Sequence, residues 1–207
     1  NNSAVYEHRK PEAGFFMKKW KELHDSHAGE PGIFSRYACQ RIAARNGRRD
    51  ATVDFGTNPC SEIILRPFQF CNLTEVVVRA GDTVDELERK VRLATVLGTI
   101  QSTLTDFKYL RKIWKNNCDE ERLLGVSMTG ILDNPEIMNA EILIRLREVA
   151  VATNKEWAER LNIHPSAAIT CVKPSGTVSQ LVDSASGLHP RHSRYYLRTV
   201  RADNNDP

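Results

Sequence analysis

The chain has 207 residues, 41% of them hydrophobic and 27% charged, and its formal net charge is +3. These are the proportions of an ordinary globular protein, and so small a net charge argues against non-specific nucleic-acid binding, which needs a dense basic face. No apolar run approaches the roughly 18 residues of a membrane-spanning helix, so no membrane association is expected. The polar opening stretch, NNSAVYEHRKPEAG, contains neither a signal peptide nor an initiating methionine. We therefore expect a cytoplasmic protein, of which this chain is a piece.

The cysteines are scattered and include no CxxC pair, so zinc-ribbon and thioredoxin-like motifs are absent. Their odd number and irregular spacing argue against a secreted disulfide scaffold. Each thiol is expected to be a buried apolar filler or a reactive group in a reducing compartment. The five are Cys39, Cys60, Cys71, Cys118 and Cys171.

The first part of the chain predicts one helix followed by loops and a short strand. Apolar and basic residues at near-helical spacing predict that a helix begins within residues 14–23. Polar stretches that contain glycine predict loops at residues 27–36 and 44–50. A β-branched run then predicts a short strand that enters a loop at Gly56.

The middle of the chain predicts a strand and then the clearest helix. Residues 62–79 alternate imperfectly around a proline, which predicts extended structure with a turn and a short strand to Val78. A helix is predicted over residues 83–103, because Thr83 and Glu86 have the spacing of a capping box. Its small and apolar residues share one face and predict close packing there: Leu87, Val91, Ala94 and Gly98.

The second half predicts further alternation of strand and helix. An apolar run at residues 121–131 indicates a strand, and residues 167–172 indicate a second, buried one. Between them, residues 140–161 form an amphipathic helical pattern, and residues 192–201 predict a final strand. Such alternation is typical of an α/β fold. The helix should turn the following residues toward a core: Leu143, Leu146, Ala150, Trp157 and Leu161.

The stretch KPSGTVSQL, residues 173–181, follows the predicted buried strand. A strand that ends in a Ser-Gly-Thr turn before a helix aims unpaired backbone N–H groups at one point, which suits an anion such as phosphate. Gly176 would allow close approach to the backbone. The stretch lacks the GK[ST] ending of a Walker A loop. The alternative is an ordinary turn in which Ser175 or Thr177 caps a helix.

The stretch TNPCSEIILRPFQFCNL carries an amide, a thiol and a carboxylate at alternate positions, Asn58, Cys60 and Glu62. In extended backbone these side chains point the same way and could meet one ligand. A carboxylate next to a thiol raises the thiol pKa, and no histidine lies nearby in sequence to activate the thiol. The pattern therefore favours a thiol that works in another way, for example through a radical. The alternative is a loop with a buried cysteine and solvated polar neighbours.

Four stretches carry these motifs together: TNPCSEI, FCNL, GTIQSTLTDFKYLRKIWKNNCDEERLLGVSMTGI and ITCVKPSGTVSQLVDSASGLHPRHSRYYLRTVR. Over nearly the whole chain, residues 1–206, they resemble the catalytic subunit of ribonucleotide reductases. The similarity is closest to the class II, adenosylcobalamin-dependent branch. Its central motif reads Asn-Pro-Cys-x-Glu, whereas class I subunits more often carry leucine before the cysteine.

The resemblance implies that residues 1–207 are one partial catalytic domain. That domain would be part of a ten-stranded α/β barrel with a central finger loop that carries the reactive cysteine. The finger loop would lie near residues 56–66 and a phosphate-binding turn near residues 173–179.

The resemblance also implies roles for individual residues in the reduction of ribonucleotides to 2′-deoxyribonucleotides. Cys60 would carry a thiyl radical and take hydrogen from C3′, Glu62 would act as base on the 3′-hydroxyl, and Asn58 would bind the ribose hydroxyls. Cys71 would be one of two cysteines that supply reducing equivalents. The substrate phosphates would bind the turn formed by Ser175, Gly176, Thr177 and Val178. No metal ligand is expected in this chain.

The same resemblance implies adenosylcobalamin as cofactor, with contacts mostly outside this chain. It implies a ribonucleoside di- or triphosphate substrate, dNTP or ATP effectors in the full-length protein, and a thioredoxin-like reductant, and it allows a homodimer. The upstream partner of Cys71 and a C-terminal cysteine pair are missing from the pattern, so we expect a central fragment.

Other functions stay open at the level of sequence. One is a class I large subunit fed by a separate diiron radical protein. Another is a non-catalytic nucleotide-binding fragment, and a third is a zinc or redox protein, which the cysteine spacing disfavours. His24 and His27, like His189 and His192, show HxxH spacing, but they are expected to be solvated or structural.

Overall fold

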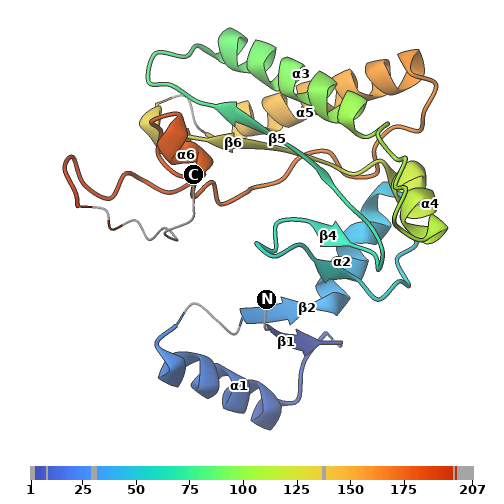
Figure 1. Cartoon of the computed structure of the whole chain (residues 1–207). Coiled ribbons are helices and arrows are strands. Elements are labelled where there is room, and N and C mark those ends of the chain that lie inside the picture. The colour runs from blue at the N-terminus through green and yellow to red at the C-terminus, as the bar shows by residue number, and fades with distance from the viewer. Residues whose placement is uncertain (1–2, 8, 29–31, 137–138, 198, 200–207) are drawn as a thin grey trace.

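The computed structural model describes residues 3–7, 9–28, 32–136, 139–197 and 199. Helices and short strands alternate along these residues (Figure 1). In chain order the elements are β1 Ser3–Tyr6, α1 Ala13–Ser26, β2 Gly32–Ser35, α2 Arg36–Ala43, the 3₁₀ helix η1 Ala44–Asn46, β3 Gly56–Thr57, β4 Ile64–Leu65, β5 Asn72–Val77, α3 Val84–Gln101, α4 Lys112–Glu121, β6 Leu124–Thr129, the 3₁₀ helix η2 Ile131–Asp133, α5 Ala140–Arg160 and α6 Val178–Leu181.

The strands of the described residues form three separate two-stranded sheets. β1 pairs with β2 and β5 pairs with β6, both in parallel, whereas β3 and β4 form an antiparallel hairpin. The predicted mixture of helices and strands is confirmed. The described strands do not close into a barrel by themselves, and the expectation that they are part of a ten-stranded barrel stays a prediction.

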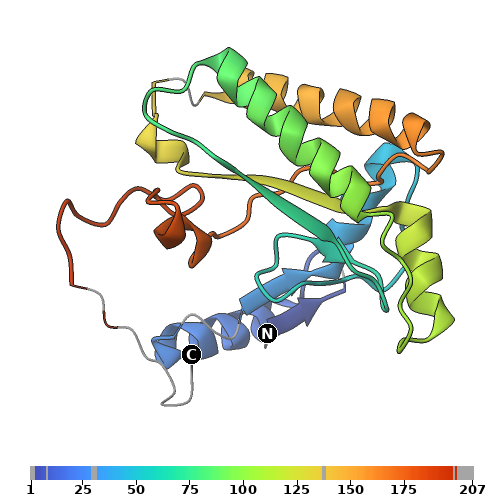
Figure 2. The same ribbon diagram turned by 45° about the horizontal axis from the view of Figure 1, so that its top comes forward.

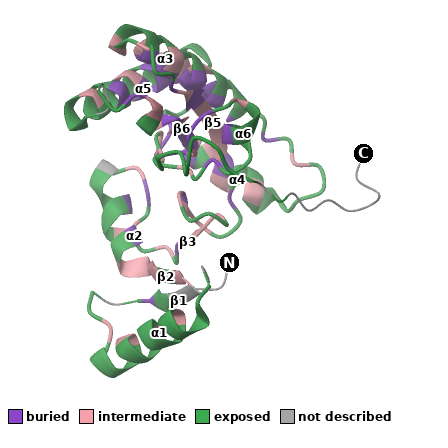
Figure 3. Ribbon diagram, turned by 90° about the vertical axis from the view of Figure 1, so that its left-hand side faces the viewer, coloured by how far each residue is buried: buried purple, intermediate pink, exposed green. Residues whose placement is uncertain are grey.

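Helices α3 and α5 lie side by side and cover one face of the β5–β6 sheet (Figures 1 and 2). Buried apolar side chains fill this interface, which Figure 3 shows as a buried layer, whereas α1 contains no buried residue. The hydrophobic effect of this layer is the main stabilising term in this half of the chain. Its members include Val76, Val78, Leu87, Val91, Leu124, Val126, Leu146 and Ala150.

The capping box predicted for α3 is confirmed. Thr83 accepts a hydrogen bond from the Glu86 amide, and the Glu86 carboxylate accepts one from the Thr83 amide. The close packing predicted at Gly98 is also confirmed, because a Cβ atom built there would lie 3.2 Å from Leu124 Cδ2. A larger side chain at this position would push the helix away from β6.

A polar side chain joins the two covering helices inside this layer. Asn154 of α5 is fully buried and donates from Nδ2 to Thr99 Oγ1 on α3 at 3.0 Å and to Ser166 Oγ at 2.9 Å. Its Oδ1 accepts from the Ser166 amide at 2.8 Å. Since buried amides need hydrogen-bond partners, this network fixes the position of α5 against α3 and against the segment that follows α5.

A buried ion pair links α4 to the segment before the β3–β4 hairpin. Arg49 donates to Glu121 from Nε at 3.0 Å and from Nη2 at 2.9 Å, and both side chains are at least 96% buried. Gln69 donates to the same carboxylate, and Arg49 also donates to the Ile64 carbonyl on β4. These bonds tie the hairpin to α4.

We expect Glu121→Gln to lower the free energy of unfolding by about 3–5 kcal/mol, because it leaves the Arg49 charge buried without a counterion. The measurement is urea unfolding followed by circular dichroism. Glu120→Gln is the matched control. Its side chain is 62% exposed and pairs with Arg66, and a salt bridge whose carboxylate remains open to water contributes less than about 1 kcal/mol. Equal losses in the two variants would contradict a structural role for the buried pair.

Several local predictions are wrong. Residues 32–35, expected within a loop, form β2 beside β1, and residues 167–172 contribute a single bridge, Val126 to Thr170, in place of a regular strand. Leu143 and Leu161 are 38% and 36% exposed. The described part of 192–201 contains no strand, and residues 198, 200 and 201 lie outside the described residues. None of the described helices combines the length and the apolar character needed to cross a bilayer.

Candidate active site

Cys60 lies at the exposed tip of the β3–β4 hairpin. The loop closes through hydrogen bonds from the Asn58 amide to the Ile63 carbonyl at 3.3 Å and from the Ser61 amide to the Asn58 carbonyl at 3.0 Å. Asn58 Oδ1 also accepts from the Ile63 amide at 3.0 Å, as asparagine does in tight turns. The segment is therefore a turn, and the extended geometry expected for Asn58, Cys60 and Glu62 is wrong.

The turn places Asn58 close enough to Glu62 for its side chain to be among the groups that lower the pKa of that carboxylate. The side chain of Glu62 is 1% exposed, and its Oε1 accepts from Lys173 Nζ at 2.9 Å across 111 residues of sequence. Burial alone would raise the pKa of Glu62, but the bond from Lys173, with smaller contributions from the Glu62 backbone and from Asn58, outweighs it and lowers the pKa. Glu62 is thus ionised in the folded protein at neutral pH.

Two thiols lie near this carboxylate. Cys71, just before β5, and Cys171 both pack against the cluster formed by Ile63, Leu123 and Ala167. Burial, and then the Glu62 charge, raises the pKa of Cys71, and the same causes raise the pKa of Cys171 to about 12. Both groups are therefore thiols at neutral pH. Sequence reasoning gave no role to Cys171, because only the fold brings it near Glu62 and Cys71.

The predicted phosphate-binding turn follows directly after Lys173. Ser175 is 3% exposed, and its Oγ is buried without a hydrogen-bond partner within the described part of the chain. Gly176, Thr177 and Val178 are exposed. A Cβ atom built on Gly176 would meet no atom within 4 Å, so the packing of the protein does not by itself require glycine there.

A frame of polar contacts that the sequence did not reveal supports this turn. Thr129 at the end of β6 donates to the Ala185 carbonyl at 3.0 Å and accepts from the Gly187 amide at 2.9 Å. Asp133 accepts from the Ala185 amide at 2.8 Å and pairs with Arg191 at 2.9 Å. Since Ser186 Oγ donates to the Ser175 carbonyl at 2.8 Å, the frame holds the turn from its C-terminal side.

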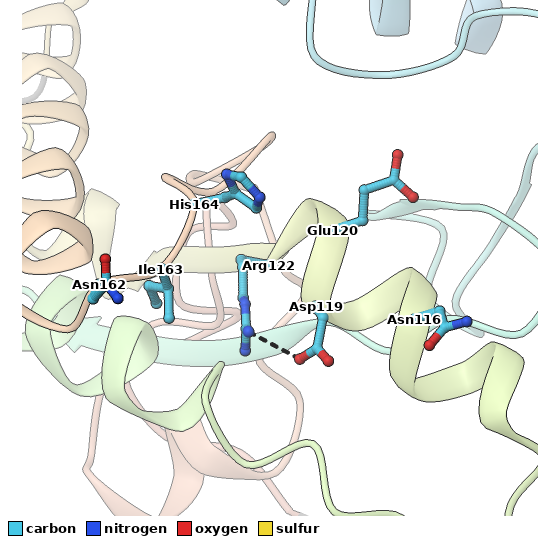
Figure 4. Close-up of a pocket in the computed structure, with 7 residues that line it drawn as sticks. All are labelled: Asn116, Asp119, Glu120, Arg122, Asn162, Ile163 and His164. Atoms are coloured by element: carbon cyan, nitrogen blue, oxygen red, sulfur yellow. Dashed lines mark ion pairs between the residues drawn. The ribbon is translucent and has the colours of Figure 1, made fainter.

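A separate cavity of about 620 Å³ lies between α4 and the segment after α5 (Figure 4). Its charged groups are neutralised locally, because Arg122 pairs with Asp119 at 2.9 Å and Glu120 pairs with Arg66. None of the predicted site residues lines it, so we do not assign the chemistry to this cavity. Its lining consists of Asn116, Asp119, Glu120, Arg122, Asn162, Ile163 and His164.

No family model matches the chain, but curated relatives do. The chain is 32% identical to the adenosylcobalamin-dependent ribonucleoside-triphosphate reductase of Lacticaseibacillus paracasei over 216 aligned residues, which cover 86% of this chain and 28% of that protein. The corresponding protein of Levilactobacillus brevis is 29% identical, with 87% of this chain and 28% of the relative covered. The chain is a homologue of these reductases. It spans 28% of the length of the curated relatives that it matches.

The reductase fold is also found by structural comparison. A crystal structure described as a B12-dependent, class II ribonucleotide reductase superposes with a TM-score of 0.65, covering 91% of this chain and 30% of that chain. At 24% identity this likeness concerns the fold alone. The curated relatives named above confirm the resemblance to class II ribonucleotide reductases that was drawn from the motifs, for the part of those proteins that this chain spans.

Proposed function

We propose that the chain is the central part of the catalytic domain of an adenosylcobalamin-dependent ribonucleotide reductase and acts within a longer protein. The domain would span residues 1–207, with the finger loop near 56–66 and the phosphate-binding turn near 173–179. One observation carries the proposal. The exposed thiol of Cys60 lies at the tip of a hairpin, and the same hairpin contains the buried, ionised side chain of Glu62 near Asn58. The homology of the reductases supports the same conclusion.

The proposed reaction assigns one task to each group around the hairpin. Cys60, as a thiyl radical, takes the hydrogen atom from C3′ of the ribose while Glu62 accepts the proton of the 3′-hydroxyl. Asn58 binds the ribose hydroxyls. The 2′-hydroxyl takes a proton from the Cys71 thiol and leaves as water. The second thiol, outside this chain, gives a hydrogen atom to C2′, and its sulfur joins the Cys71 thiolate as a disulfide. The electron released by this step reduces the 3′-ketone, and Glu62 returns its proton to the 3′-oxygen. Cys60 then returns a hydrogen atom to C3′ and is a thiyl radical again.

The protonation states of the described groups support this division. Glu62 has a lowered pKa and is a carboxylate that can accept a proton, whereas Cys71 has a raised pKa and keeps the proton that it must donate. A thiol close to a carboxylate is a poor thiolate nucleophile but remains a hydrogen and proton donor. The arrangement therefore favours radical chemistry over thiolate catalysis.

The cofactor proposed by homology is compatible with these residues, because Cys60 is exposed on the hairpin tip and open to a neighbouring radical source. When bound, adenosylcobalamin supplies the radical that removes the hydrogen atom from the Cys60 thiol. Its contacts are proposed to lie mostly outside this chain. The relatives and the structural neighbour are all named as cobalamin-dependent, which favours class II over a class I subunit with a diiron partner.

The substrate is proposed to be a ribonucleoside triphosphate, because the curated relatives are named ribonucleoside-triphosphate reductases. Its phosphates would bind the backbone of the turn formed by Ser175, Gly176, Thr177 and Val178. The open space around Gly176 supports close approach by a ligand. Effector nucleotides, a thioredoxin-like reductant and a homodimer are proposed for the full-length protein only.

Glu62→Gln tests the proposal in the full-length reductase. The variant keeps size and hydrogen bonding but loses the base, so we expect the turnover number to fall by about 10²–10⁴-fold. Deoxynucleotide formation is measured with adenosylcobalamin, ribonucleoside triphosphate and dithiothreitol. The exposed control Glu120→Gln should retain activity, and a comparable rate in both variants would remove Glu62 from the reaction.

A further inference from the structure

Lys173 connects the two halves of the proposed site. Its ammonium group lies 2.9 Å from Glu62 Oε1, and its backbone starts the segment that leads two residues later into the phosphate-binding turn. The backbone itself is fixed: the Lys173 amide donates to Ser127 Oγ of β6 at 3.0 Å, and a Cβ atom built on Gly187 would lie 2.8 Å from the Lys173 carbonyl oxygen. The lysine therefore reaches the carboxylate from a rigid point of attachment.

The two oxygens of the Glu62 carboxylate differ in their surroundings. Oε1 is held by Lys173, whereas Oε2 is buried and has no hydrogen-bond partner among the described residues. A buried acceptor without a donor is unfavourable, and it is uncommon enough to point to a missing partner. A hydroxyl group of the substrate is such a donor.

We infer that Lys173 is a positioning residue for the reaction proposed above, on which this inference rests. It holds Oε1 of Glu62 so that Oε2 faces the ribose hydroxyl whose proton the carboxylate removes. Because Lys173 adjoins the phosphate-binding turn, it also sets the base at a fixed distance from the bound phosphates. One residue thereby aligns the ribose of the bound nucleotide with the Glu62 base and its phosphates with the turn.

Lys173→Met in the full-length reductase tests the inference, because it removes the ammonium group and keeps most of the stem. We expect the turnover number to fall about 10–100-fold, as misplacement of a reacting group does, with little change in KM. Lys173→Arg keeps the charge and should restore part of the rate. Lys173→Gln, measured beside them, provides a folded variant if the methionine is not tolerated.

The pH profile supplies a readout that a merely structural role would not move. The charged form of Glu62 is the active one, so activity is lost as the pH falls through its pKa. Burial raises the pKa of Glu62 and Lys173 lowers it, so removal of Lys173 should raise this pKa. The acid limb of the pH profile should then move to higher pH. The other titratable groups near Glu62 do not change charge there, since Cys71 and Cys171 have raised pKa values and stay neutral, and the pKa of Lys173 is raised by Glu62.

Lys90→Met is the matched control. Lys90 lies on α3, and its side chain is 28% exposed, against 29% for Lys173. It pairs with Asp82, just before that helix, at 2.6 Å. The inference would be overturned if Lys173→Met lowered the turnover number no more than Lys90→Met does. It would also be overturned if Lys173→Met raised KM and left the turnover number unchanged, a result that would make Lys173 a phosphate ligand. If Glu62→Gln is fully active, the proposed function fails. If Glu62→Gln is inactive and Lys173→Met is normal, only the role of Lys173 fails.

Discussion

Cys60→Ser is expected to abolish ribonucleotide reduction in the full-length reductase while nucleotide binding stays nearly intact. A serine O–H bond is too strong for the hydroxyl to replace a thiyl radical, so every turnover would stop before hydrogen is taken from C3′. Loss of a group on which the whole mechanism depends typically costs several orders of magnitude in rate. The measurements are deoxynucleotide formation and equilibrium nucleotide binding.

The fold should tolerate this change, because Cys60 is exposed at the tip of the hairpin. The turn itself is closed by Asn58, Ser61 and Ile63. Cys39→Ser, on α2, is the control for thiol loss outside the site. A Cys60→Ser rate above roughly a tenth of the wild-type rate, far more than removal of an essential group allows, would exclude Cys60 as the radical residue.

Cys71→Ser is expected to separate the start of the reaction from its completion. In the proposed reaction, hydrogen abstraction needs Cys60, Glu62 and the nucleotide, whereas reduction at C2′ needs the Cys71 thiol. The variant should therefore activate the nucleotide but fail to reduce it, and the intermediate should decompose with release of free base and inactivation of the enzyme. Cys60→Ser should release no base.

Free-base release from labelled nucleotide, with adenosylcobalamin present, distinguishes the two variants. The raised pKa of Cys71, caused by burial and by Glu62, keeps the thiol protonated and ready to donate at neutral pH. Identical behaviour of the two variants would contradict the proposed division between the cysteines. Normal deoxynucleotide formation by Cys71→Ser over many turnovers with dithiothreitol would contradict it equally.

The contacts that the sequence predicted well are local ones. The capping box of α3 joins Thr83 to Glu86 over three residues, and the helical periodicity of 140–161 corresponds to α5. Such features depend on backbone hydrogen bonds and side chains within one turn of helix, which the nearby sequence fixes. The motif around Cys60 was likewise readable, although its backbone is a turn and not an extended strand.

The errors concern residues whose structure depends on distant partners. β2 forms because β1 lies beside it, and residues 167–172 share three backbone hydrogen bonds with β6 without forming a regular strand. Strand formation requires a neighbouring strand to accept and donate hydrogen bonds, so a short apolar run predicts it poorly. The exposure of Leu143 and Leu161 likewise reflects which face of α5 meets α3.

The sequence by itself determined the set of chemical groups: Asn58, Cys60 and Glu62 in one short segment, Cys71 eleven residues later, and the turn after Lys173. The tertiary structure alone decided the protonation states of those groups and which partners they contact. Lys173 meets Glu62 across 111 residues, and Arg49 meets Glu121 across 72. Such ion pairs arise only when folding excludes water and brings the charges together, because charges that remain solvated interact weakly.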